Sequence, residues 1–447
     1  MSRLTADQAR QLAARVVALT QADAAEVVVV SADDSLTRFA ENRIHQNVTE
    51  TDTRISVRAV LGDRQGVAST NRLDEASLAG CCAAAVAAAS AAPADPAFPG
   101  LPSPVPVQTP VRAAEAAAGF GPEQRAEVAL GIVRQCSSRL IQAAGGVAST
   151  LQTVAIGNSL GVDVGMETTS VRATVLAQTD RAGSGWASFH GPDPTGLVAD
   201  ALGDEAATLA RRSEYPADLE PGSYTVVLAP EAVADIVDFL GYLGFSARSF
   251  EEGRSFLSGN LEKRIMSELV TISDNACAPE SFGLVFDYEG MPKRRVPLIE
   301  NGVATGVVTD SYWAARTGRA NTGHALPAPN AFGPMTLDLM MDAGETTLDE
   351  LIGSVERGVY VTRFHYVNAE DPVPVTLTGM TRDGTFLIED GELATPLKNQ
   401  RFTQGAVAAL NAVKGVTRDR AFFDVMLGSA LVPGLLIDGW EFTGQTG

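Results

Sequence analysis

Apolar residues recur at helical and strand spacing along the first part of the chain. Leu12, Val16 and Leu19 fall on one face of a helix, and Thr5 and Gln8 fit a capping box at its start. Strands are predicted over 26–31, 36–41, 49–61 and 66–70, followed by a helix over 74–92. This stretch therefore predicts a helix, several strands and a second helix.

The same order recurs in the next stretch of the chain. Helices are predicted over 122–144 and 194–212, and strands over 147–156, 161–167, 170–178 and 185–190. A short echo accompanies this recurrence, because Ser56-Val57-Arg58-Ala59 resembles Ser170-Val171-Arg172-Ala173. Asn42-Arg43-Ile44 and Asn158-Ser159-Leu160 precede the two segments. The echo is a weak repeat signal, so duplication and chance similarity of strand composition both stay open.

A proline-rich segment separates the two stretches. Residues 91–112 contain seven of the chain's 23 prolines, which predicts an extended connector without helix over 93–110. A second break falls over 214–222, where prolines precede Gly222. We therefore predict an N-terminal α+β domain over 1–215, built from helices and antiparallel sheet and possibly duplicated, and a second domain over 222–447.

Hairpin signals dominate the second half. Asn301-Gly302 separates apolar runs at 296–300 and 303–309, which predicts a two-residue turn. Further turns are predicted at Asp383-Gly384 and Asp390-Gly391. Short helices are predicted after the Thr347/Glu350 capping pair and over 403–413. The second domain is thus predicted to be largely antiparallel β with a few helices, and the fold class is α+β.

Composition narrows the partners and the compartment. The net charge is −20, from 54 acidic and 34 basic residues, which disfavours nucleic acid as a partner. We find no long apolar run of membrane-spanning character, so no membrane association is expected. The first residues lack the apolar core of a signal peptide, and Cys81, Cys82, Cys136 and Cys277 form no Cys-x-x-Cys. We therefore expect a cytoplasmic protein with reduced, packed thiols.

Segment 224–243 carries the most informative motif. It reads YTVVLAPEAVADIVDFLGYL and predicts a strand followed by a helix that begins at Pro230. Here, and at GRSFLSG (253–259), FDYEGMPKRRVPLIENGV (286–303) and NTGHA (321–325), the chain resembles the TldD/PmbA family of bacterial peptidase subunits, also known as modulators of DNA gyrase. Zinc-bearing members carry His-Glu-x-x-x-His on this helix and a cysteine near the C-terminus. In this chain Pro230 and Asp235 stand at the two His positions, Glu231 stands at the Glu position, and Met426–Ile437 contains no cysteine.

The resemblance implies a PmbA (TldE)-like subunit with no catalytic residue and no metal or other cofactor of its own. Its partner would be a zinc-bearing TldD-like subunit, and an extended or unfolded peptide would be the substrate. Two alternatives remain: a homodimer that binds peptides without cleaving them, and a hydrolase with an unrecognised site. Such a site is most readily built on His324 with Asp287 or Glu289.

Six polar residues in glycine-rich segments are candidates for gripping peptide backbone by hydrogen bonds. They are Arg254, Ser255, Asp287, Glu289, Asn321 and Thr322. The simpler interpretation is that such residues cap turns around neighbouring glycines. Glu231 has an equally simple interpretation: with Pro230 at the first helical position, an exposed acidic side chain favours the helix N-terminus.

Overall fold

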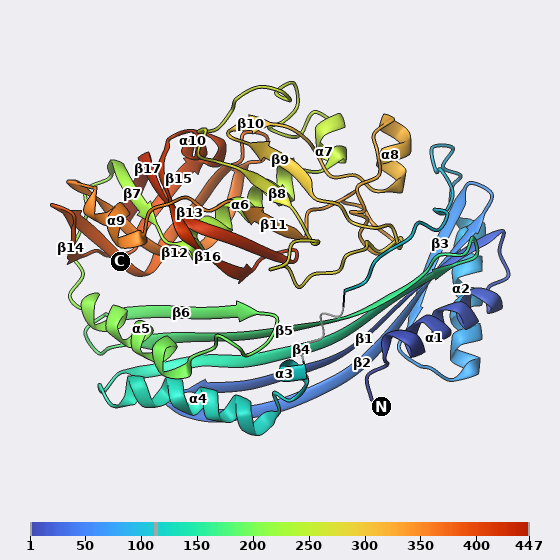
Figure 1. The fold of residues 1–447 in the computed structure, drawn as a ribbon, viewed down its shortest axis with the longest axis horizontal. Helices are drawn as coiled ribbons and strands as arrows, with labels where there is room; N and C mark the ends of the chain where they lie inside the picture. Colours follow the sequence, from blue (N-terminus) through green and yellow to red (C-terminus); the bar gives the residue numbers. More distant parts are fainter. Residues whose placement is uncertain (1, 111–114, 446–447) are drawn as a thin grey trace.

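Two β-sheets stacked on one another form the protein (Figure 1). This computed structural model describes residues 2–110 and 115–445. Within them, one sheet has six strands and the other has eleven. The predicted α+β class is confirmed, with an antiparallel first sheet and a larger mixed second sheet.

The first sheet consists of two successive units with the same order of elements. The first unit contains α1 (Ala6–Leu19), β1 (Ala24–Ala40), β2 (Arg43–Leu61), β3 (Arg64–Thr70) and α2 (Glu75–Ala91). After the short α3 (Glu115–Ala118), the second contains α4 (Pro122–Ser137), β4 (Gln142–Asn158), β5 (Asp163–Gln178), β6 (Ser184–Gly191) and α5 (Ala199–Arg212). Antiparallel pairing of β1 with β4 joins the units in the order β3-β2-β1-β4-β5-β6. The predicted recurrence of a helix, strands and a helix is therefore present.

Strict alternation along the strands gives this sheet two buried faces. On β1, Val27 and Val29 pack with α1 and α2, whereas Val28 packs with Phe286 of the C-terminal part. On β4, Val147 faces α4 and α5, whereas Val154 faces the C-terminal part. The helices α1, α2, α4 and α5 therefore cover one face, and the C-terminal part covers the other (Figure 1).

Two predicted interruptions of strands were wrong. The segments 26–31 and 36–41 belong to one strand, β1, and 161–167 and 170–178 largely merge in β5. Between the two predicted segments, Asp33 accepts a hydrogen bond from Thr51 of β2 and Asp34 accepts one from Thr150 of β4. Hydrogen bonds to the neighbouring strands thus satisfy these carboxylates, and the strand continues without a turn. The Thr5–Gln8 capping box of α1 is confirmed.

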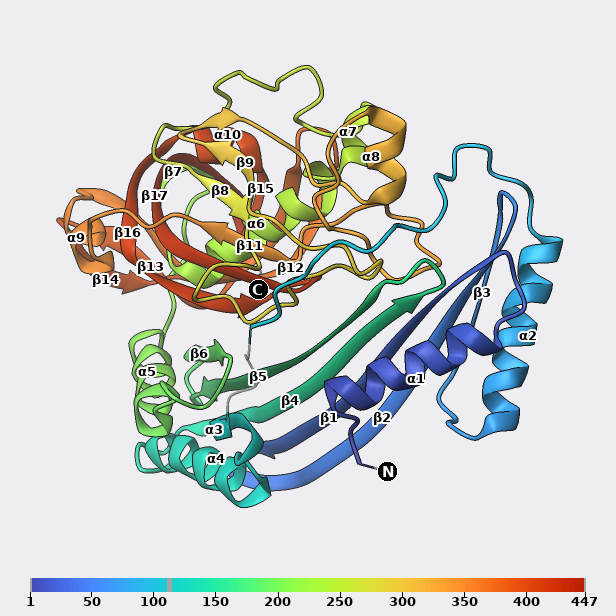
Figure 2. The same ribbon diagram turned by 45° about the vertical axis from the view of Figure 1, so that its right-hand side comes forward.

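The second sheet contains two parallel pairs among mainly antiparallel ones. Its strands are β7 (Gly222–Leu228), β8 (Ile272–Asp274), β9 (Val296–Glu300), β10 (Val303–Ala304), β11 (Asp338–Met341), β12 (Arg357–Asp371), β13 (Thr376–Glu389), β14 (Glu392–Pro396), β15 (Gln400–Gly405), β16 (Val413–Asp424) and β17 (Ser429–Gln445). Because β17 pairs with both β15 and β7, the strands β7, β12, β13, β15 and β17 close into a ring (Figure 2).

Five helices accompany the second sheet in the described residues: α6 (Pro230–Gly244), α7 (Ala247–Glu251), α8 (Ser311–Thr317), α9 (Leu348–Gly353) and α10 (Ala406–Asn411). The capping box at Thr347 and Glu350 is confirmed, whereas the helix expected over 403–413 is limited to α10 because 403–405 belong to β15. None of the helices in the described part is long and apolar enough to cross a membrane.

Two of the three predicted turns are present, and the third is not. Asn301 and Gly302 have φ of 47° and 78°, which suits the two-residue turn between β9 and β10. Asp390 and Gly391 likewise turn between β13 and β14. The turn expected at Asp383-Gly384 was wrong, because these residues form a bulge inside β13 where its register with β12 shifts. The expectation of packed thiols was wrong for Cys277, which is exposed.

Candidate functional site

The start of α6 lies where the two sheets meet. Strand β7 leads through Ala229 directly into the helix, and Pro230 occupies the first helical position, where a missing N–H costs nothing. The helix is apolar around most of its circumference and is buried against β7, β12 and β17. Its first turn therefore cannot shift, and it presents Glu231 and Asp235 toward β6 of the first sheet.

Glu231 is not the exposed helix-start residue that the sequence suggested. Its Oε2 accepts hydrogen bonds from Trp186 Nε1 at 2.9 Å and from Ser188 Oγ at 3.0 Å. Burial raises the pKa of Glu231 above its ordinary value, although these two donors oppose the shift. The side chain is therefore held by neutral donors of β6, and no cation pairs with it among the described residues.

Asp235 lies one helical turn further along the same face of α6. Burial, reinforced by the charges of Glu231 and Asp238, raises the pKa of Asp235 to about 7. Burial also raises the pKa of Asp238 to about 6, although its Oδ2 accepts a hydrogen bond from the Met426 backbone at 3.1 Å. Three acidic groups on one helix thus share an environment that resists negative charge.

Glu231 and Asp235 form part of the wall of a cavity of about 440 Å³ between the sheets. The cavity is lined by Leu36, Gly146, Ala148, Arg172, Thr174, Trp186, Ser188, Phe189, His190, Glu231, Ala234, Asp235, Arg363, Phe364, Phe422, Phe423, Asp424 and Val425. We call it the α6 cavity. Its floor comes from the inward-facing residues of β4, β5 and β6, and its roof comes from α6, β12 and β16.

A second cavity of about 370 Å³ adjoins the α6 cavity, and both are lined by His190 and Asp424. Its floor continues along β4, because Gly146 and Ala148 line the first cavity and Thr150 and Gln152 line the second. These four alternate residues share one face of the strand and span about 20 Å at the usual rise per residue. The two cavities therefore follow a course long enough for an extended chain of about six residues.

The residues around α6 do not fit a zinc ion. Pro230 has no donor atom, and Glu231 Oε2 is occupied by Trp186 and Ser188. Within residues 2–110 and 115–445, no three His, Cys, Asp or Glu side chains are grouped to hold a metal ion. Metal-activated hydrolysis therefore has no support at this position in this chain.

Four of the six proposed peptide-gripping residues lie away from the α6 cavity in contacts within the chain. Ser255 is buried and donates to the Gly244 carbonyl at 2.6 Å, while Thr322 bonds with Thr309. Arg254 is exposed and pairs with Glu252. Asn321 Nδ2 donates to Ser311 Oγ at 3.0 Å. The structure does not bring these residues together around one cavity.

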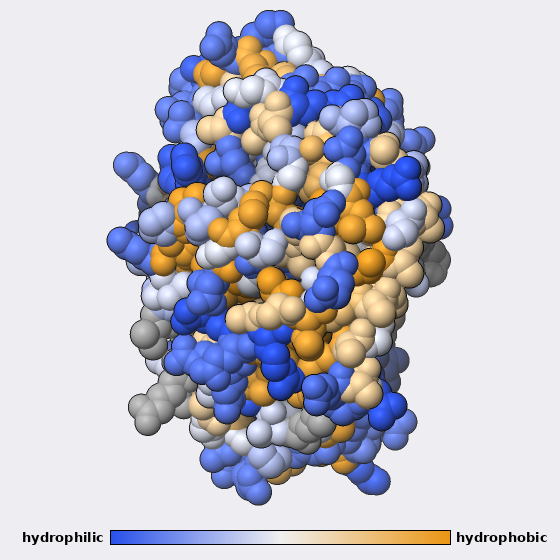
Figure 3. All heavy atoms as spheres, turned by 90° about the vertical axis from the view of Figure 1, so that its right-hand side faces the viewer, coloured by the Kyte–Doolittle hydropathy of each residue, from blue (hydrophilic) through white to orange (hydrophobic). Residues whose placement is uncertain are grey.

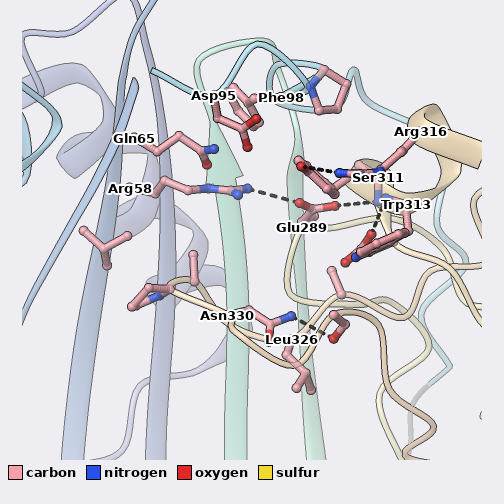
Figure 4. Close-up of a pocket in the computed structure, with 18 of the residues that line it drawn as sticks. Arg58, Gln65, Asp95, Phe98, Glu289, Ser311, Trp313, Arg316, Leu326 and Asn330 are labelled. Atoms are coloured by element: carbon pink, nitrogen blue, oxygen red, sulfur yellow. Dashed lines mark hydrogen bonds and ion pairs between the residues drawn. The ribbon is translucent and has the colours of Figure 1, made fainter. Parts of the chain in front are cut away.

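Asp287 and Glu289 occupy one loop but differ in role. Asp287 is buried, and its carboxyl oxygens accept hydrogen bonds from the backbone of Glu289, Met291 and Ala325. Glu289 lines a third cavity, of about 670 Å³, and its carboxylate reaches Arg58 Nη2 at 3.4 Å and the Ser311 backbone at 3.2 Å. Figure 4 shows Glu289 between Arg58 of β2 and Ser311 at the start of α8. Glu289 is therefore the one of the six that lines any of the three cavities described here.

His324 pairs with a different carboxylate from the two that the sequence suggested. Its Nε2 lies 3.0 Å from Asp274 Oδ1, and both side chains are fully buried. Asp274 also accepts hydrogen bonds from the backbone of Leu337 and Asp338, and His324 with these contacts holds its pKa well below the ordinary range. The pair ties β8 to the loop that carries His324, and the backbone contacts of Asp274 tie β8 to the start of β11, which is a structural arrangement rather than a hydrolytic one.

Family models match nearly the whole chain. The PmbA/TldA metallopeptidase domain 1 matches residues 25–89, the central domain matches 101–214, and the C-terminal domain matches 221–444. The chain belongs to the PmbA/TldD family.

Several curated relatives are metalloproteases by name. A zinc metalloprotease TldD homolog of Saccharolobus solfataricus is 29% identical over 209 residues, which are 44% of this chain and 44% of that protein. A metalloprotease of Methanothermobacter thermautotrophicus is 28% identical over 222 residues, covering 48% and 47%. The chain thus matches less than half the length of either relative.

Solved structures share the whole fold. TldE from Thermococcus kodakarensis superposes with a TM-score of 0.87 at 19% identity, covering 97% of this chain and 99% of that one. A putative modulator of a DNA gyrase from Thermotoga maritima gives 0.84 at 18% identity, with the same coverage. The likeness to these structures includes the arrangement of the sheets. At such low sequence identities it shows a shared fold and nothing further.

Several residues of the α6 cavity of this PmbA/TldD-family chain were not identified from its sequence. Trp186 and His190 of β6, Arg363 of β12 and Asp424 of β16 come from three separate parts of the chain and meet only in the fold. Arg172 was visible as part of the Ser-Val-Arg-Ala echo, but the echo indicated a repeat rather than a cavity. No local motif links these residues, so spatial proximity is the only signal.

Proposed function

We propose that this chain is the non-catalytic, metal-free subunit of a TldD/TldE-type metallopeptidase assembly. In this proposal a TldD-like subunit supplies zinc, and this chain supplies part of the wall that holds an extended peptide. The proposed setting is the cytoplasm, where unfolded peptides arise. The peptidase chemistry itself would take place in the partner.

The start of α6 is the observation that carries this proposal. Pro230 and Asp235 occupy the positions where zinc-bearing relatives are expected to have histidine, and Glu231 is bound by Trp186 and Ser188. A peptidase glutamate must be able to reach a metal-bound water, which this arrangement does not offer. The fold is retained while the start of α6 is changed. This combination favours a supporting role over a catalytic one.

The course of the two adjoining cavities supports peptide binding. It runs along β4 over small and uncharged floor residues, so an extended chain would meet little steric hindrance. Strand β6 lines the α6 cavity and stands at the edge of its sheet, where an extended chain would add as a further strand. These features suit backbone recognition rather than recognition of one particular sequence.

The surface offers a candidate contact for a partner. Seen from the side of α2 and α8, apolar side chains gather across the middle of the molecule between more hydrophilic parts (Figure 3). The outward residues of α2 include Ala79, Ala83, Ala84 and Ala87, all exposed. Apolar surface of this kind favours protein contacts.

Co-expression with a zinc-bearing TldD-like subunit from the same genome tests the proposal. We expect the two chains to co-purify in a defined ratio, with zinc measured by elemental analysis in the pair and less than a tenth of a molar equivalent in this chain alone. We also expect hydrolysis of an unfolded peptide by the pair alone. Replacing the glutamate of the partner's zinc motif by glutamine is the matched control and should abolish that hydrolysis.

Three results would contradict the proposal. They are stoichiometric zinc in the isolated chain, peptide cleavage by the isolated chain, and a self-dimer that ignores every TldD-like candidate in light-scattering measurements.

A further inference from the structure

The charges around the α6 cavity do not balance. Two arginines line the cavity, and each already has its own carboxylate: Arg172 pairs with Asp424, and Arg363 Nε binds Asp383 Oδ2 at 2.9 Å. The cavity's remaining acidic residues are Glu231 and Asp235. The charge of Arg363 acts on both acids from a distance, but Arg363 is paired with Asp383 and forms no ion pair with Glu231 or Asp235 among the described residues.

Asp235 is the least satisfied of these groups. Its carboxyl group receives no hydrogen bond and forms no ion pair within the part of the chain that the structure describes. Glu231 uses one oxygen, Oε2, for both of its donors, so Oε1 stays available. Two carboxyl groups on adjacent turns of one rigid helix thus face the cavity with spare acceptor capacity.

His190 does not supply the missing positive charge. Burial lowers the pKa of His190 to about 4, so the imidazole is neutral at physiological pH. Its Nδ1 is buried without a hydrogen-bond partner in the described residues. A neutral imidazole stacked edge-on against Phe282, with ring centroids 5.0 Å apart, forms part of the wall rather than a counterion.

The rest of the wall is rich in aromatic rings, which attract cations through their electron-rich faces. Trp186, Phe189, Phe364, Phe422 and Phe423 all line the cavity. One cation is already bound in this way, because the Arg363 guanidinium carbon lies 4.0 Å from the centroid of a Trp186 ring. Aromatic rings attract a further cation in the same way, and the carboxyl groups of Glu231 and Asp235 would add their own attraction for it.

We propose that the α6 cavity binds a primary ammonium group, with Glu231 and Asp235 as its counterions and the surrounding aromatic rings as its walls. This inference rests on the proposed function, since the ammonium group would belong to the peptide that the assembly handles. The group has two possible sources in a peptide, the α-amino terminus and a lysine side chain. At about 440 Å³ the cavity has room for an ammonium group together with the residue that carries it.

The same charges exclude other ligand groups. A carboxylate or phosphate placed near Glu231 and Asp235 would meet repulsion that paired arginines cannot relieve. A neutral amide would bring no positive charge to offset the burial that raises the pKa of both acids, whereas an ammonium group would. The site therefore selects its ligands by positive charge rather than by shape.

Three C-terminally amidated hexapeptides that share otherwise uncharged side chains distinguish the possibilities when each is titrated into the isolated chain at pH 7.5 by calorimetry. The first has a free amino terminus and no lysine, the second is N-acetylated, and the third is N-acetylated with one central lysine. We expect the first or the third to bind at least tenfold more tightly than the second. Preference for the first identifies the amino terminus, and preference for the third identifies a lysine side chain.

Matched variants locate the binding. Asp235→Asn and Glu231→Gln keep side-chain size, and each should reduce the preference for the ammonium-bearing peptide at least fivefold. Asp218→Asn removes an exposed acid that pairs with Lys398 and should leave the preference unchanged. Equal affinities for all three peptides, no binding of any peptide, or full retention of the preference in both cavity variants would overturn the inference.

Association with a TldD-like subunit is measured separately on the same wild-type protein. A chain that prefers ammonium-bearing peptides but finds no partner would keep this inference and refute the proposed assembly. A chain that pairs with the partner but shows no such preference would support the proposed assembly and refute this inference.

Discussion

At the scale of single residues, burial rather than sequence position decides how an acidic group behaves. The replacement of metal-binding positions by Pro230 and Asp235 is readable from the sequence, because proline has no donor. The surroundings of Glu231 are not readable, because Trp186 and Ser188 precede it by more than forty residues and reach it only through the stacking of the two sheets. The start of α6 was therefore predictable as an unusual position, but its surroundings and the rest of the α6 cavity were not.

The raised pKa of Asp235 predicts a pH dependence of stability. Its folded-state pKa of about 7 lies above the ordinary value of 3.8, so folding favours the protonated form. This contribution is complete below about pH 4 and is lost as pH rises toward 7. We expect Asp235→Asn to be more stable than wild type at pH 8 by roughly 2 kcal/mol, with little difference at pH 4. Chemical denaturation at several pH values measures both quantities.

Asp218→Asn is the control for this comparison, since its carboxyl group is exposed and lies in another environment. If Asp235→Asn follows the wild-type pH profile throughout, the carboxyl group is not destabilised by burial.

At the scale of elements, local patterns gave the type of most elements but not the length of the strands. Helices with clear caps, such as those beginning after Thr5 and Thr347, were predicted because their signals lie within one turn. The bulge at Asp383-Gly384 and the unbroken β1 depend on pairing with distant strands, which no local window contains. Tertiary pairing therefore overrides turn chemistry in the middle of a sheet.

Close packing of α4 against α5 predicts an inverted effect of a glycine substitution. A Cβ at Gly203 of α5 would lie 2.7 Å from the Ile132 carbonyl oxygen of α4, which is backbone and cannot move aside. We expect Gly203→Ala to destabilise the protein by about 1–3 kcal/mol, although alanine is the better helix former. The midpoint of thermal unfolding provides the measurement.

Gly80→Ala in α2 is the matched control, because nothing lies within 4 Å of its added Cβ. It should stabilise the protein by about 0.5–1 kcal/mol. Equal effects of the two substitutions would show that the α4–α5 crossing is looser than described.

At the scale of the whole molecule, two ion contacts at corresponding positions of the two units join the first sheet to the C-terminal part. Arg58 of β2 reaches Glu289, and Arg172 of β5 reaches Asp424. Both arginines belong to the Ser-Val-Arg-Ala echo and stand on the second strand of their unit. The echo thus marks corresponding strands of a recurring architecture, and each arginine connects the first sheet to the second.

The two contacts differ in burial and should differ in strength. Arg58 is buried beside the buried Glu26, whereas the side chains of Arg172 and Asp424 are 43% and 51% exposed. We expect Arg58→Met to cost about 3–5 kcal/mol because it leaves buried carboxylates uncompensated. Arg172→Met should cost at most about 1 kcal/mol. Parallel denaturation of both variants tests this, and equal losses would contradict it.

The connector that follows α2 has a consequence for how the chain can be divided. Residues 103–106 are exposed, while the two units of the first sheet remain joined by pairing of β1 with β4 from Glu26↔Asn158 to Phe39↔Gly145. The covalent connection between the two units is therefore not needed to hold β1 and β4 in register. A protein nicked within these four residues should stay assembled, and two separately made fragments should recombine, because main-chain hydrogen bonds between β1 and β4 and the packing of Val28 on Phe286 both cross the division.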